Sequence, residues 1–138
     1  MDIDSTRCYT KCMANLVAAS HRVFKTTWFS KAAKKAHISD DELCEAIRQV
    51  MFGQADDLGG GVFKKRLNKN RHRSIIVVAK AHGIWVYEYL FAKNDQANIE
   101  HDQLAGFRKL AKVYGTLTEQ QVNQLIENGS WREICNGD

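Results

Sequence analysis

The chain has 138 residues, of which 44% are hydrophobic and 26% are charged, and its net charge is +4. These values are typical of one globular domain with a single core. No apolar run approaches the length of a membrane span, and the first twenty residues lack the basic start and apolar block of a secretory signal. We therefore expect a cytoplasmic protein.

The first predicted elements are a short strand and two helices. Residues 23–29 (VFKTTWF) are rich in β-branched and aromatic side chains, which favours a strand. The segment KAAKKAH that follows predicts a short helix with alanines facing inward and lysines outward. Ser39 and Glu42 have the spacing of a capping box, and an apolar stripe at helical spacing continues from Leu43. A helix over 40–52, ended by Gly53, is therefore predicted.

Three strands and two helices are predicted in the second half of the chain. The strands cover 62–68, 74–81 and 84–93, and His82-Gly83 is typical of a tight hairpin turn between the last two. Sequential strands with short links pair antiparallel, so the three form a meander. A helix over 101–114 follows, and a second capping box at 118–121 opens another. The order indicates an α+β fold with the helices packed on one sheet face and the other face open.

Alternation along the strands predicts which side chains share the open face. In the strand 62–68, Phe63 and Leu67 belong to the core, so Lys64 and Arg66 should point to the open side. Arg73 opens the central strand. In the strand 84–93, alternation separates one set of side chains (Trp85, Tyr87, Tyr89, Phe91, Lys93) from the other (Ile84, Val86, Glu88, Leu90).

Basic residues are concentrated in one segment. From Val62 to Asn94 there are eight Lys or Arg against the single acid Glu88, a net charge of +7, so the rest of the chain is net acidic. Such a concentration indicates a polyanionic partner. A basic sheet edge that deters aggregation explains it equally well. Composition alone leaves both interpretations open.

The cysteines and glycines do not predict a conventional chemical site. Cys8 and Cys12 have no second ligand pair at matching spacing, so no metal is expected. Cys44 lies on the apolar helix stripe, and all four cysteines, including Cys135, are expected to be reduced thiols. The glycines at 59–61 lead into a strand, so they predict a turn and not a phosphate loop.

The stretches "LGGGVFKKRL" and "VYEYLFAKNDQANIEHDQLAGFRKLAKVY", with an Arg at the start of an Ile/Val-rich strand between them, resemble RelE/HigB-type toxins of bacterial type II toxin–antitoxin modules. The resemblance covers about residues 22–117 and leaves 1–21 as an N-terminal extension and 118–138 as a helical tail. It implies a RelE-like α+β fold: a short N-terminal strand, two helices, a three-stranded antiparallel meander and C-terminal helices on one sheet face.

The function implied by the resemblance is a metal-independent mRNA endoribonuclease that acts on the ribosome, inhibits translation and needs no cofactor. In such enzymes the ribose 2′-OH attacks the adjacent phosphate, and basic side chains stabilise the developing charge. The implied partner is an antitoxin, expected to be a helix-turn-helix protein, with DNA contacted only through it. The alternatives are a ParE-like toxin that inhibits DNA gyrase and a non-catalytic RNA-binding relative.

The resemblance also implies site residues. Two features depart from the family: the loop LNKNRHR lacks the customary glycines, and the segment after the last strand offers His101 but no tyrosine. The general acid and base are therefore left open between His72 and His101, and Tyr87 and Tyr89 are not assigned. The expected catalytic residues are Lys64, Arg66, Arg73 and Lys93, and the expected RNA-binding residues are Lys65, Lys69, Arg71, His72 and Asn94.

Overall fold

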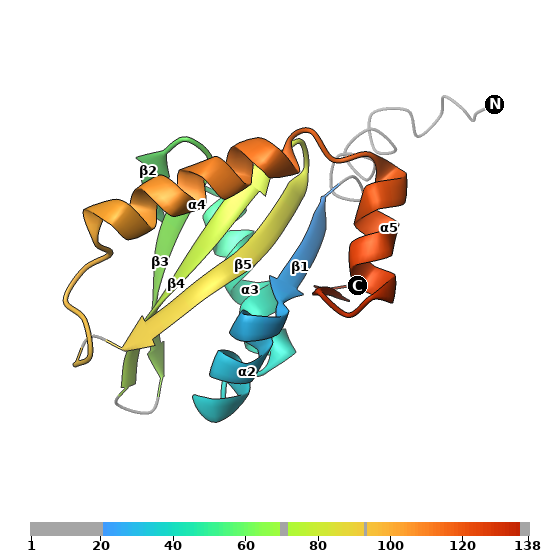
Figure 1. The fold of residues 1–138 in the computed structure, drawn as a ribbon. Coiled ribbons are helices and arrows are strands. Elements are labelled where there is room, and N and C mark those ends of the chain that lie inside the picture. The colour runs from blue at the N-terminus through green and yellow to red at the C-terminus, as the bar shows by residue number, and fades with distance from the viewer. Residues whose placement is uncertain (1–20, 70–71, 93, 136–138) are drawn as a thin grey trace, which may run out of the picture.

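The computed structural model describes residues 21–69, 72–92 and 94–135, with the backbone alone for 68–69 and 72–77. Strands and helices follow one another along the chain without a regular repeat (Figure 1). No helix in these ranges is long and apolar enough to cross a bilayer. The elements are β1 (Arg22–Thr26), α2 (Thr27–Lys35), α3 (Asp40–Met51), β2 (Asp56–Gly59), β3 (Val62–Lys69), β4 (His72–Ala81), β5 (Ile84–Ala92), α4 (His101–Tyr114), α5 (Glu119–Glu127) and β6 (Trp131–Ile134).

The strands form a six-stranded sheet in the order β2-β3-β4-β5-β1-β6. All neighbours are antiparallel except β1 and β5, which are parallel. The predicted α+β class and the β3-β4-β5 meander are confirmed. The sheet is wider than predicted because β2 pairs with β3 and β6 pairs with β1.

The predicted helices agree closely with the structure where capping signals are present. The Ser39 hydroxyl accepts from the amide of Glu42 at 3.2 Å, and the Glu42 carboxylate accepts from the Ser39 amide at 3.0 Å. Thr118 and Gln121 form the same reciprocal pair at the start of α5. These side chains satisfy amides that a helix start leaves without intrahelical partners, so the boundaries are set locally.

The predicted strand over 23–29 is wrong at its C-terminal end. β1 stops at Thr26, whose hydroxyl accepts from the amide of Phe29 at 3.0 Å and caps α2. Trp28 and Phe29 therefore lie in the first turn of a helix. Phe29 is buried, whereas Trp28 is exposed. A helix cap has overridden the strand preference of the aromatic residues.

Helices cover both faces of the sheet, so the prediction of one wholly open face is wrong. Figure 1 shows α4 crossing the sheet on the near side, with α3 behind it. Buried Val23, Trp85 and Tyr87 pack with α3, whereas their neighbours Phe24 and Val86 pack with α4 and α5. Both faces of β1 and β5 are therefore apolar, as strands sandwiched between helices require. The far ends of β3, β4 and β5 project beyond α4 (Figure 1).

A β-bulge in β5 changes which residues face α4. The register runs from Val77↔Tyr89 to Val78↔Tyr87, which leaves Glu88 without a partner on β4. The bulge places Glu88 and Tyr89 on the same side, where Glu88 accepts a hydrogen bond from Tyr114 of α4 and Tyr89 contacts Phe107. The predicted alternation is therefore wrong beyond Glu88: Tyr89 lies on the face opposite Tyr87.

A disulfide joins Cys44 of α3 to Cys135, just after β6, with their Cα atoms 5.5 Å apart. The expectation that these two cysteines are reduced thiols is therefore wrong. The sequence showed no pairing signal because the partners are 91 residues apart and are brought together only by the position of β6 at the sheet edge. Cys8 and Cys12 lie outside the described residues.

Gly61→Ala is expected to destabilise the fold by about 2 kcal/mol. Gly61 has φ +84°, and a Cβ there would lie 2.7 Å from the backbone oxygen of Lys80. The contact cannot relax easily, because the Lys80 amide donates to the Gly61 carbonyl at 2.7 Å. Gly129→Ala is the matched control, since Gly129 has φ +83° with nothing within 4 Å of the added Cβ. Urea unfolding of both variants should show a clearly larger loss for Gly61→Ala; equal losses would contradict the predicted contact.

Candidate nucleic-acid interface

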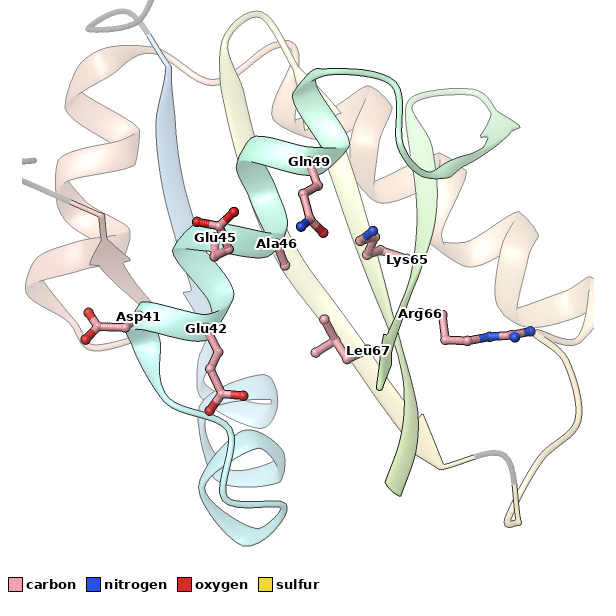
Figure 2. A pocket seen from close by; sticks show the side chains of 8 residues that line it. All are labelled: Asp41, Glu42, Glu45, Ala46, Gln49, Lys65, Arg66 and Leu67. Atoms are coloured by element: carbon pink, nitrogen blue, oxygen red, sulfur yellow. The ribbon is translucent and has the colours of Figure 1, made fainter. Parts of the chain in front are cut away.

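The basic residues of β3 divide between the two faces of the sheet. Phe63 and Leu67 pack in the cluster that contains α3, and Val62 packs with Phe91 beneath α4. Figure 2 shows Lys65 and Leu67 pointing toward α3 while Arg66 points away from it. Lys64, two residues from Val62, lies on the same face as Val62 by the pleat of the strand. The predicted separation of Lys64 and Arg66 from Phe63 and Leu67 is confirmed.

Lys65 borders a groove of about 550 Å³ between α3 and β3 (Figure 2). The α3 wall of this groove carries Asp41, Glu42 and Glu45, and the β3 wall is formed by residues 65–67. Three carboxylates make the α3 wall unfavourable for phosphate, since like charges repel. The groove therefore has a different electrostatic character from the α4 side of β3.

Lys64 and Arg66 are the described cations on the α4 side of β3. The Lys64 side chain is partly buried, and its Nζ lies 3.7 Å from the carboxylate of Asp56 on β2. Asp56 is exposed, so this ion pair is a weak restraint in water. Arg66 lies beyond the paired length of β2 and is exposed. Its guanidinium is free to contact a ligand with two donors at once.

Tyr89 lies in the same row of the sheet as Lys64. Lys64 is opposite Val77 on β4, and Val77 is opposite Tyr89 on β5. Adjacent strands are about 4.8 Å apart, so the two backbones are separated by about 10 Å. Tyr89 packs against the cluster that contains Val62, which places its ring on the α4 face. A phenol and an ammonium group therefore share one surface.

The hydroxyl of Tyr89 belongs to a network of side-chain amides. It donates to Gln96 Oε1 at 3.2 Å and accepts from Gln103 Nε2 at 3.2 Å. Gln96 Nε2 in turn donates to Gln103 Oε1 at 2.6 Å and to the carbonyl of Asn98 at 2.7 Å. The network fixes the phenol relative to the start of α4. It orients a group that can both give and accept a hydrogen bond.

Tyr87 is not available for chemistry at this surface. Its side chain is fully buried on the α3 face, where it stacks on Phe29, and its hydroxyl donates to the carbonyl of Leu43. Burial raises the pKa of this phenol above its usual range. The bulge thus separates two tyrosines that strand alternation would have placed together.

Glu88 is the acid within the basic segment, and it is buried beneath α4. Burial raises the pKa of its carboxyl to about 7, while the hydrogen bond from Tyr114 acts in the opposite direction. The carboxyl is therefore about half protonated near pH 7. It subtracts only part of a unit charge from the positive charge of the neighbouring Lys64 and Arg66.

The other predicted site residues that the structure describes lie at the ends of β3 and β4 and in the segment after β5. Backbone register places Arg73 opposite Asn68 and His72 opposite Lys69. Asn94 is exposed in the turn after β5, and His101 is the exposed first residue of α4. Arg71 and Lys93 lie outside the described residues.

Three residues of this surface were missed from the sequence: Trp28, Gln96 and Gln103. Trp28 was assigned to a strand, and no motif marks the two glutamines. Tyr89 was left unassigned because, like Tyr87, it was expected to lie too near the interior of the sheet. The sequence signal that could have located Trp28 is the Thr26 cap three residues before Phe29.

Comparison with known families gives one result. The family model described as "RelE toxin of RelE / RelB toxin-antitoxin system" matches residues 21–134. This span runs from the residue before β1 to the end of β6 and includes α5. No curated protein matches the chain.

Proposed function

We propose, from the premise that this chain belongs to the RelE family of toxins from toxin–antitoxin systems, that it is a metal-independent endoribonuclease that cleaves mRNA on the ribosome. The observation that carries this proposal is the surface shared by Lys64, Arg66 and Tyr89 on the α4 side of the sheet. It combines cations with a held phenol, which suits a reaction at a phosphodiester.

The proposed reaction transfers a phosphoryl group within the RNA. The 2′-oxygen forms a bond to the adjacent phosphorus, the bond from phosphorus to the 5′-oxygen breaks, and a cyclic phosphate remains on the upstream fragment. One proton leaves the 2′-OH and one reaches the departing 5′-oxygen. We assign the proton transfers to groups among His72, His101 and Tyr89. The cations assigned to the extra negative charge are Lys64, Arg66, Arg73 and Lys93.

The proposed RNA path continues from this surface to the β3–β4 hairpin, because basic residues continue along both strands toward it. Contacts to the RNA backbone and sugars are assigned to Lys69, Arg71, His72 and Asn94. Lys65 is not assigned, because it points toward the acidic α3 wall of the groove on the other side of the sheet. The proposed location is the cytoplasm, where ribosomes are reached. The proposed partner is a helix-turn-helix antitoxin, and DNA is contacted only through that partner.

Lys64→Ala and Arg66→Ala are each expected to slow ribosome-dependent mRNA cleavage at least tenfold, because each removes a cation from the transition state (about 1.4 kcal/mol per tenfold). The measurement is primer extension on a defined mRNA incubated with ribosomes and each variant. Lys112→Ala is the charge-matched control, since Lys112 is an exposed lysine near the C-terminal end of α4. It should cleave at the wild-type rate.

Two outcomes would contradict the nuclease. Growth arrest with intact mRNA and inhibited DNA gyrase would assign the ParE-like activity instead. RNA binding without cleavage and without growth arrest would assign a non-catalytic RNA-binding protein.

A further inference from the structure

Trp28 is a large aromatic residue left half-exposed beside the candidate interface. Its side chain is 51% exposed although it lies on the first turn of α2, next to the fully buried Phe29. Its ring stacks on that of Tyr89, with centroids 5.1 Å apart and planes inclined by 28°. A ring covered on one side by Tyr89 and still half-exposed presents its other side to solvent.

The sheet and α4 support the stacked rings of Trp28 and Tyr89. Tyr89 contacts Phe91 and Phe107 at ring-centroid distances of 5.7 Å each. Its hydroxyl is fixed by Gln96 and Gln103. The Thr26 cap fixes the first turn of α2, which carries Trp28. The exposed indole is therefore a pre-positioned flat surface, and binding there costs little conformational entropy.

This flat surface adjoins positive charge. Tyr89 lies about 10 Å from Lys64 along one row of the sheet, and both are on the α4 face. An aromatic face next to a cationic strand is the arrangement by which proteins hold single-stranded nucleic acid, with bases on the rings and phosphates on the cations.

We propose that Trp28, supported by Tyr89, is a platform on which an unpaired base of single-stranded RNA stacks while Lys64 and Arg66 hold the adjoining phosphates. This proposal deepens the function proposed above and rests on RNA being the substrate. It assigns Trp28 to positioning of the substrate. The basic β3 favours a polyanion over a protein segment as the occupant of the exposed indole.

The test measures binding of a short single-stranded RNA whose sugars are 2′-O-methylated, so that no 2′-OH is available for cleavage. Tryptophan fluorescence is a specific readout because Trp85 and Trp131, the other two tryptophans, are only 3% and 4% exposed. We expect the RNA to quench the wild-type emission. Trp28→Ala should lose this quenching and bind roughly ten- to hundredfold more weakly by anisotropy of a labelled RNA. Trp28→Phe should retain most of the affinity.

Salt dependence separates stacking from charge. Trp28→Ala should keep the wild-type slope of log affinity against log salt, whereas Lys64→Ala should reduce it, since only the lysine displaces counterions. Phe52→Ala is the matched aromatic control: Phe52 is 83% exposed at the end of α3, the helix that covers the opposite sheet face. It should bind RNA as the wild type does.

The outcomes distinguish this proposal from the nuclease assignment. Unchanged RNA affinity and quenching in Trp28→Ala, with mRNA cleavage intact, would overturn the platform and leave the nuclease standing. Loss of antitoxin affinity without loss of RNA affinity would overturn it in favour of a protein-docking residue. Stacking on Trp28 without any cleavage of mRNA would support the platform while removing the nuclease. Absence of RNA binding by the wild type would overturn the platform.

Discussion

Glu88→Gln is expected to make the protein more stable than the wild type above pH 7. The difference in free energy of unfolding between variant and wild type should increase by up to about 3 kcal/mol from pH 4 to above pH 7. Burial raises the pKa of the Glu88 carboxyl from 4.5 to about 7. Between these values the folded chain keeps a proton that the unfolded chain has released. The contribution of Glu88 to the free energy of unfolding therefore falls by about 1.4 kcal/mol for each pH unit across this interval.

Below pH 4.5 this carboxyl is protonated in both states, and its contribution to stability is fully present. As pH rises toward 7 that contribution is lost, because the folded state must finally bury a carboxylate. A Gln side chain has no proton to lose, and its carbonyl can still accept from the Tyr114 hydroxyl as Glu88 does. The free energy of unfolding of the variant should therefore not include this loss at high pH.

The measurement is urea unfolding of both proteins at intervals from pH 4 to pH 8. The difference in free energy between variant and wild type should grow across pH 4.5–7 and then level off. Glu127→Gln, at the exposed last residue of α5, is the control and should follow the wild type. Parallel curves for wild type and Glu88→Gln would show that the folded chain does not retain the Glu88 proton.

Cys135→Ser is expected to reduce the free energy of unfolding by about 2–4 kcal/mol under oxidising conditions. The disulfide from Cys44 to Cys135 spans 91 residues, so it restricts most of the unfolded chain. It also joins β6, at the edge of the sheet, covalently to α3, which packs in the same core cluster as Ile134 of β6. Removing one sulfur releases both restraints.

Reductant provides an independent measurement of the same bond. Dithiothreitol should lower the wild-type urea midpoint to that of Cys135→Ser and leave the variant unchanged. The double variant Cys8→Ser/Cys12→Ser should retain the full response to reductant. A reductant-insensitive wild type, or an equally large response in Cys135→Ser, would contradict a stabilising bond between Cys44 and Cys135.

Local signals in the sequence predicted much of the secondary structure. The Ser39–Glu42 and Thr118–Gln121 capping boxes placed the starts of α3 and α5, and helix 101–114 agrees with α4. The His82-Gly83 turn placed the β4–β5 hairpin, and both residues adopt positive φ. These features depend on side chains within a few positions of one another, so the sequence contains their full cause.

Features that depend on distant partners were not predictable from those signals. β2 and β6 are four residues long, and each is a strand because a neighbouring strand pairs with it. The Cys44–Cys135 bond exists because β6 lies at the sheet edge near α3. The first strand was extended too far because aromatic residues favour strands, whereas Thr26 capped a helix at that point.

The candidate site also combines features that the sequence predicted with features that depend on distant parts of the chain. The sequence by itself determined that basic residues concentrate between Val62 and Asn94 and that alternation places Lys64 and Arg66 on one face of β3. Tertiary structure alone decided that Tyr89, and not Tyr87, joins that face and that Trp28 stacks on it. The physical reason is the bulge at Glu88: one extra residue reverses the alternation, and it is accommodated because Glu88 meets Tyr114 on α4, 26 residues away.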